Sequence, residues 1–398
     1  MQRAGALVCA ASTSSETRLM TLDAFSRSFV AVLRQEVPVE KGHEAEVGAY
    51  LRGLSLWRRY GPKARETPPT VIEIQDAWLS DPAIPSATGA VTPAAAADIP
   101  ALAVGLRLVR RGNHTLTARG RLVRLLSGEG ASSVVNHRWS PNPYLVQRGL
   151  GLAILYALLD ADGDVLVAAF RSLLESDSSE FTRYRFAVDH LTAGCERLRR
   201  AAVKRGLSGE DVARVRRLSE MRESILQTAR TKDKAETWGG GRPPDQAATV
   251  RLEPYVDLGL LTKADRFSYT YSLNASQHGF FAFLADAQTL QDVVDQSLVA
   301  AYLRGIGAQA VHKVPRDVIW ERIEEAYGDM RSGMGYAAFA EVILLAIGRL
   351  VDDGTGGYFE MSEGVDVIRE HQRAAPAHVQ LTVARGGALR YMRIKGGG

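Results

Sequence analysis

The chain has 398 residues, of which 46% are hydrophobic and 24% are charged, and its formal net charge at neutral pH is +4. This length predicts two or three domains, and this composition is typical of globular proteins. The longest strongly apolar stretch, residues 150–159, is much shorter than the ~20 residues that span a bilayer, so no membrane crossing is expected.

Cysteine and lysine usage give two further indications. Only Cys9 and Cys195 are present, which excludes a disulfide framework and a cysteine-rich metal site and favours a reducing cytoplasm. Eight of the 49 basic residues are lysines, a bias that we interpret as codon drift in a GC-rich bacterium. Residues 1–19 are left out of the fold prediction, as a loose tail or the product of an upstream start codon.

Charge is distributed unevenly along the chain. Residues 180–234 contain 14 basic and 8 acidic residues, whereas residues 280–370 contain 7 basic and 15 acidic ones. From residue 371 onward there are five basic residues and no acidic ones. This segregation indicates that different segments face different partners, with chance clustering on solvated faces as the alternative.

One pattern occurs twice, in residues 104–126 and 258–284. A helix ends at a glycine suited to a left-handed cap, and a short strand, a polar turn and a second strand follow. The second strand ends in a residue that can cap a new helix. In the first copy the cap glycine is Gly105, the capping residue is Thr117 and the new helix begins near Gly120. In the second copy the corresponding residues are Gly259, Asn274 and Gly279.

This order of elements resembles the C-terminal half of the winged-helix superfamily, over about 25 residues in each copy. The resemblance implies that the helix before each hairpin lies in the major groove of DNA and that the basic wing contacts phosphates. Many winged helices instead serve only as protein docking modules, and the second copy, with Asp265, Tyr269 and Tyr271 in its wing, is the one suspected of that role. Pro254 predicts a kink or a new start in the helix before the second wing.

A second pattern predicts a long helical hairpin. Between residues 181 and 202, apolar residues recur in steps of three and four, as in a coiled-coil seam, at Phe181, Tyr184, Val188, Leu191, Cys195, Leu198 and Ala202. Ser208 and Asp211 then begin a second helix that should pack antiparallel to the first. Upstream, residues 145–159 and 165–174 should form two apolar helices joined by the acidic turn 160–164.

The predicted fold is therefore mainly α with small β-hairpin wings: tandem winged-helix domains plus a long antiparallel helical hairpin. The expected parts are an N-terminal tail and helix (1–42), a first winged helix (43–140), a second (141–290) and an acidic helical C-terminal domain (291–398). The second part includes the basic hairpin (180–232) and a flexible linker (233–248). The last part should contain helices at 317–327, 336–350 and 363–372 and a basic β-hairpin at 379–383 and 389–394, an order that allows a third winged helix.

Motifs for catalysis are not found in the sequence. Phosphate-loop, dinucleotide-binding and zinc signatures do not occur, so no cofactor or metal is expected. The turn 160–164 resembles the opening of a calcium loop, but Arg171 stands where the closing glutamate belongs, which favours a solvated turn. Glu73, on an expected strand at 70–74, lacks the partners of a nuclease site.

Basic residues in the wings and the hairpin are the candidate DNA contacts. They are Arg110, Arg111, Asn113, His114, Arg119 and Arg121 in the first unit; Arg197, Arg199, Arg200, Lys204, Arg205, Arg216 and Arg217 in the hairpin; Arg251, Lys263 and Arg266 in the second unit; and Arg385, Arg390 and Arg393 in the C-terminal hairpin. The acidic helix 317–327 should point away from DNA and bind another protein subunit or a second copy of the chain. Its candidate contacts are Trp320, Glu321, Glu324 and Glu325.

The sequence thus predicts a non-catalytic subunit of a bacterial protein complex, of the DNA-processing or anti-phage defence type, that binds double-stranded DNA. No small-molecule ligand is evident. Two alternatives stay open: a stand-alone transcriptional regulator or plasmid replication initiator, and a divergent nuclease or other enzyme with an unrecognised site.

Overall fold

The computed structural model describes residues 106–108, 117–126, 148–176, 178–206, 209–230, 245–263, 269–287, 290–308, 311–384 and 388–395. This part of the chain is mainly helical with a few short strands, which confirms the mainly α prediction. The helix at 43–60, the strand at 70–74 and the wing of the first copy lie outside the described residues.

The helices are α7 (Ala118–Leu126), α8 (Arg148–Glu175), α9 (Arg183–Arg185), the π-helix η2 (Phe186–Leu191), α10 (Thr192–Lys204), α11 (Gly209–Arg230), α12 (Asp245–Asp257), α13 (Ala275–Asp286), α14 (Leu290–Gln296), α15 (Leu298–Gly305), α16 (Arg316–Met330), α17 (Phe339–Asp352) and α18 (Met361–Ala374). The strands are β1 (Glu180–Thr182), β2 (Thr262–Lys263), β3 (Thr270–Ser272), β4 (His312–Lys313), β5 (Ala337–Ala338), β6 (Gly357–Tyr358), β7 (Val379–Val383) and β8 (Leu389–Ile394).

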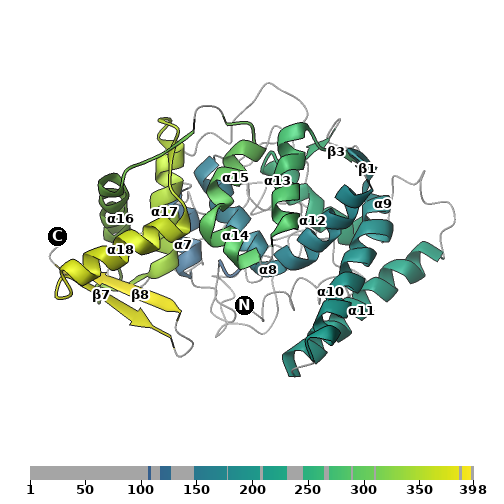
Figure 1. Cartoon of the computed structure of the whole chain (residues 1–398), viewed down its shortest axis with the longest axis horizontal. Coiled ribbons are helices and arrows are strands. Elements are labelled where there is room, and N and C mark those ends of the chain that lie inside the picture. The colour runs from purple at the N-terminus through teal and green to yellow at the C-terminus, as the bar shows by residue number, and fades with distance from the viewer. Residues whose placement is uncertain are drawn as a thin grey trace, which may run out of the picture.

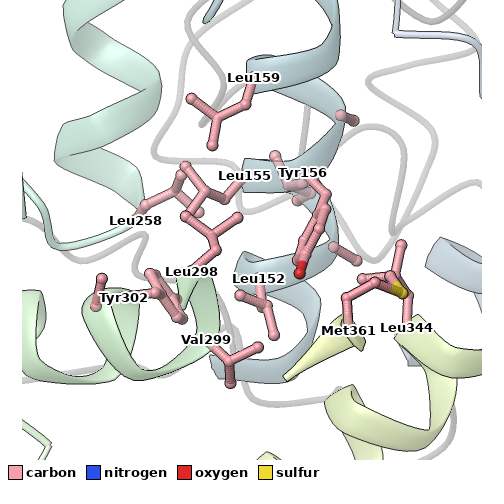
Figure 2. Close-up of a cluster of buried hydrophobic side chains, with 14 of the residues drawn as sticks. Leu152, Leu155, Tyr156, Leu159, Leu258, Leu298, Val299, Tyr302, Leu344 and Met361 are labelled. Atoms are coloured by element: carbon pink, nitrogen blue, oxygen red, sulfur yellow. The ribbon is translucent and has the colours of Figure 1, made fainter. Parts of the chain in front are cut away.

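Helix α8 is the centre of the core. It packs against α7, α10, α13 and α17, and its strongly apolar sequence fits a helix that is covered on nearly every side. Figure 2 shows four of its side chains among residues from other helices: Leu152, Leu155, Tyr156 and Leu159 of α8 with Leu298, Val299 and Tyr302 of α15, Leu344 of α17 and Met361 of α18. One cluster of buried side chains runs from Leu106 to Ile394, so the expected boundaries at 140 and 290 do not separate independent cores.

The helix caps inferred from the repeated pattern are confirmed. Thr117 Oγ1 accepts a hydrogen bond from the Gly120 amide (3.1 Å), and α7 begins directly after this threonine. Asn274 and Gln277 form a reciprocal capping box at the start of α13. Gly259 adopts the left-handed conformation (φ 75°) that the pattern requires after α12.

Of the two helix irregularities that the sequence predicts, the break at 160–164 is present, whereas no new helix start occurs at Pro254. Within the acidic segment 160–164, Asp162 leaves helical geometry (φ −145°, ψ 16°), so α8 is two helical stretches joined at a kink. Helix α12 continues through Pro254 to Asp257. It begins at Asp245, so the last part of the expected linker 233–248 is helical instead.

The prediction of one uninterrupted helix over residues 181–202 is wrong at its start. Phe181 lies in β1, where it is paired with Tyr271 of β3, and Thr182 then caps the helix that follows. The π-helix η2 further interrupts the three-and-four spacing. Helices α10 and α11 do pack together as the expected hairpin, which extends from one end of the molecule (Figure 1).

Two three-stranded sheets share one arrangement. In the first, β1 follows α8 and pairs with β3, the second strand of the hairpin β2–β3, which gives the order β1-β3-β2. In the second, β5 follows α16 and pairs with β8 of the hairpin β7–β8, which gives the order β5-β8-β7. The second sheet lies beside α18 at the end of the molecule opposite the helical hairpin (Figure 1).

Candidate nucleic-acid interface

The candidate contacts of the first unit are only partly described. Arg110, Arg111, Asn113 and His114 lie outside the described residues, as do Arg266 and Arg385. Arg119 Nη1 forms an ion pair with Asp160 (2.9 Å). Arg121 Nη2 donates a hydrogen bond to the Asp329 carbonyl (3.2 Å). Both side chains therefore connect α7 to other helices.

The acidic segment 160–164 is not the solvated turn that its sequence indicated. Each of its three aspartates forms an ion pair with arginine: Asp160 with Arg107 and Arg119, Asp162 with Arg251, and Asp164 with Arg214. These arginines come from the turn 106–108 and from α7, α12 and α11. We call this set the aspartate hub. Its ion pairs connect α7, α11 and α12 to the kink of α8.

The prediction that Arg251 and Lys263 contact DNA is wrong, because both side chains are buried. Arg251 is 3% exposed, and its Nε lies 2.6 Å from Asp162 Oδ2. Lys263 Nζ lies 2.8 Å from Glu253 Oε1, which also accepts a hydrogen bond from the Tyr271 hydroxyl (2.5 Å). In a buried setting each charge needs such a partner, so neither cation is available to a phosphate.

Four of the six candidate arginines of the helical hairpin form ion pairs with glutamates of α8, α10 or α11. Their ion pairs are Arg197–Glu175 (2.6 Å), Arg199–Glu196 (2.7 Å), Arg200–Glu196 (2.8 Å) and Arg216–Glu220 (2.7 Å). Hydrogen bonds from Arg199 and Arg200 lower the pKa of Glu196 to about 2, so this carboxylate stays charged at neutral pH. Of the hairpin candidates, Lys204, Arg205 and Arg217 have no ion pair with another described residue. The hairpin is less cationic than its sequence indicated.

Cations without an ion-pair partner also gather at the C-terminal sheet. Arg390 and Lys395 are exposed and Arg393 is half-buried on or directly after β8, while Arg369 and Arg373 are exposed on α18, which packs against β7. None of these five residues forms an ion pair with another described residue. We call them the C-terminal basic face. Sequence reasoning found Arg390 and Arg393 but missed the other three, although the absence of acidic residues after position 370 pointed to Arg373 and Lys395.

Exposed aromatic and apolar side chains accompany this charge. Seven large hydrophobic side chains are exposed in the described part of the chain, and four of them belong to the C-terminal sheet or the turn before β5: Met334, Tyr336, Val383 and Tyr391. The guanidinium carbon of Arg393 lies 5.4 Å from the centre of the Tyr336 ring, and that of Arg390 lies 5.2 Å from the centre of the Tyr391 ring. The basic face is thus interleaved with tyrosine.

Helix α16, the expected partner-binding helix, has the exposed acidic residues of the prediction but not its exposed apolar residue. Glu321, Glu324 and Glu325 are exposed, as expected. Trp320, however, is half-buried and stacks on His371 of α18, with ring centres 3.7 Å apart. The apolar anchor proposed for a partner therefore packs inside the C-terminal unit instead.

Comparison of the chain with protein-family models, with curated proteins and with solved structures gave no match. No group of three or more His, Cys, Asp or Glu side chains arranged to hold a metal ion occurs among the described residues. In the same part of the chain, every helix is too short or too polar to cross a membrane. The candidate interface therefore rests on its own geometry and charge.

Proposed function

We propose that the chain is a non-catalytic, DNA-binding subunit of a larger bacterial assembly and that its C-terminal unit, residues 316–395, carries the DNA interface. The observation that carries this proposal is the C-terminal basic face, whose five cations have no carboxylate partner in the described structure. Cations left without carboxylate partners on neighbouring elements suit a polyanion, because each phosphate they neutralise releases a condensed counterion from the DNA.

The arrangement of elements supports the same proposal. The unit runs helix α16, strand β5, helices α17 and α18, and hairpin β7–β8, with β5 paired to β8. This order is similar to that of a winged helix, in which the third helix enters the major groove and the hairpin is the wing. In this alignment α18 is the recognition helix and presents Arg369 and Arg373, while the wing presents Arg390.

The unit around β1, β2 and β3 has a comparable order, with α11 inserted between its second and third helices. Its basic residues on α12 and β2, Arg251 and Lys263, form buried ion pairs within the protein. We therefore propose that this unit has a structural or protein-docking role. The exposed glutamates of α16 are the proposed contact for a basic protein neighbour, since they would repel DNA within about a Debye length, ~8–10 Å.

Neutralising Arg369, Arg373 and Arg390 together with glutamine is expected to weaken binding to a short duplex roughly tenfold to a hundredfold. The slope of log affinity against log salt concentration should fall by about 0.9 for each lost phosphate contact. Fluorescence anisotropy between ~50 and 200 mM salt measures both quantities. The matched control changes Arg199, Arg200 and Arg216 to glutamine. It removes the same amount of charge, but from arginines that already form ion pairs with glutamates.

The control variant should lose much less affinity and keep the wild-type salt slope. Equal losses in the two variants would mean that only net charge matters, and would contradict an interface at the C-terminal unit. Thermal unfolding of each variant shows whether the fold is kept, and little change is expected because all six side chains lie at least partly at the surface.

A further inference from the structure

We propose that the outer face of the β5-β8-β7 sheet binds unpaired bases of a DNA strand by stacking. This inference rests on the proposed DNA-binding function and names the form of DNA that the C-terminal unit prefers. The surface concerned consists of Met334, Tyr336, Tyr391 and Arg393, and we call it the tyrosine ledge. Figure 1 shows β7 and β8 at one edge of the described part of the molecule.

The register of the sheet defines which side chains form the ledge. Side chains alternate between the two faces of a strand, and Met392 and Ile394 of β8 are buried against the core. Tyr391 and Arg393 therefore lie on the opposite face. The residues paired with Tyr391 are Ala338 on β5 and Thr382 on β7, neither of which has a side chain large enough to cover a tyrosine ring.

The ledge keeps aromatic surface in contact with solvent. Tyr391 is 37% exposed, Tyr336 is 39% exposed and Met334 is 79% exposed. Single exposed hydrophobic residues are common on proteins, but a group of them on one small sheet marks an interaction site. An exposed aromatic ring offers a flat π-face, which is the feature that every nucleobase can stack on regardless of its identity.

The charge around the ledge selects a nucleic acid over a protein. Arg390 and Arg393 lie next to the two tyrosine rings, and Lys395 follows at the end of β8. No acidic residue occurs after position 370. Aromatic rings flanked by cations match a strand in which each base is attached to a phosphate.

A tyrosine cannot stack on the bases inside a duplex, because their faces are already covered by neighbouring base pairs. The ledge therefore requires unpaired bases, such as those of a single-stranded tail. In this arrangement α18 and the wing bind the duplex, and the ledge binds its unpaired tail. This predicts tighter binding to a tailed duplex than to the same duplex with blunt ends.

The test compares three probes with the full chain: a blunt duplex, the same duplex with an unpaired tail, and the tail strand alone. The full chain is used because α17 shares its core with α7 and α8. Changing Tyr336 and Tyr391 together to alanine should lower the affinity for the tailed duplex by about 5- to 150-fold for each base stacked. Affinity for the blunt duplex should stay unchanged.

Two controls separate stacking from other effects. Changing both tyrosines to phenylalanine keeps the rings and should preserve tail binding, whereas loss of binding in this variant would overturn the stacking proposal. Tyr269→Ala removes another exposed tyrosine, which lies next to Arg183 and directly precedes β3, a strand near the other end of the molecule (Figure 1). It should leave all three affinities as in the wild type, and an equal loss there would also overturn the proposal.

The outcomes also separate this inference from the proposed function. Equal wild-type affinity for blunt and tailed duplex would overturn the inference and leave duplex binding intact. Failure to bind any of the three probes would overturn the proposed function itself. A fluorescent base analogue in the tail gives a second readout, since stacking on a tyrosine should quench it in the wild type and not in the alanine variant.

Discussion

Replacing Arg251 with methionine is expected to lower the free energy of unfolding by about 3–5 kcal/mol. The guanidinium is buried and forms an ion pair with Asp162 at 2.6 Å, in the kink of α8. Methionine fills much of the same space but leaves the carboxylate buried without that partner. Urea unfolding at neutral pH measures the difference.

The loss should depend on pH in a defined direction. Burial raises the pKa of Asp162 above its ordinary value of 3.8, and Arg251 acts against this rise. Without Arg251 the folded-state pKa rises further, so the folded protein holds this proton to a higher pH than the unfolded chain does. The destabilisation should therefore grow as the pH rises from the folded-state pKa of Asp162 in the wild type, which already lies above 3.8, to the higher folded-state pKa in the variant, and should shrink as the pH falls through the same range.

Two further variants show whether the buried pair causes the effect. Arg216→Met breaks an exposed pair with Glu220 and should change stability by no more than about 1 kcal/mol. Adding Asp162→Leu to Arg251→Met should restore most of the lost stability, because the uncompensated charge is then gone. If Arg251→Met is as mild as Arg216→Met, the aspartate hub does not hold α12 to α8.

Features that depend on a few neighbouring residues could be predicted from the sequence. The caps at Thr117 and Asn274, the left-handed Gly259 and the break in α8 all follow from local backbone chemistry. The helices and hairpin of the C-terminal unit were likewise predicted to within a few residues, because capping and apolar spacing agree there.

Features that depend on distant residues could not be predicted. Phe181 continues an apolar spacing that suits a helix, yet β1 forms because β3, about 90 residues later, offers it a partner. The aspartates of the kink look like a solvated turn until arginines from other helices are placed beside them. Local preference decides an element only where tertiary contacts do not compete with it.

The proposed place of the interface differs from the one predicted from the sequence for a related reason. Counting charges along the sequence gives residues 180–234 a local charge of +6. This count does not show that four of the hairpin arginines already form ion pairs with Glu175, Glu196 and Glu220. The C-terminal basic face has a smaller local charge but none of these carboxylates. We therefore propose the interface at this end of the molecule and not at the hairpin, which lies at the opposite end.

Gly149→Ala is expected to destabilise the protein by about 1–3 kcal/mol, although alanine is a better helix former than glycine. Gly149 lies in the first turn of α8, where that helix meets α17. A Cβ atom there would lie 2.2 Å from the backbone carbonyl oxygen of Gly348 and 2.5 Å from the carboxylate of Asp352. The side chain of Asp352 can turn away, but the carbonyl oxygen moves only if the two helices separate.

Gly279→Ala is the matched control, because it makes the same chemical change in the middle of α13, where the new methyl group meets no atom within 4 Å apart from its chain neighbours and the backbone of its own helix. This variant should gain about 0.5–1 kcal/mol from helix propensity alone. The same substitution is thus expected to have opposite signs at the two sites in urea unfolding. A stabilising Gly149→Ala would mean that α8 and α17 do not approach each other so closely. The C-terminal unit would then not be held against the rest of the chain by this contact.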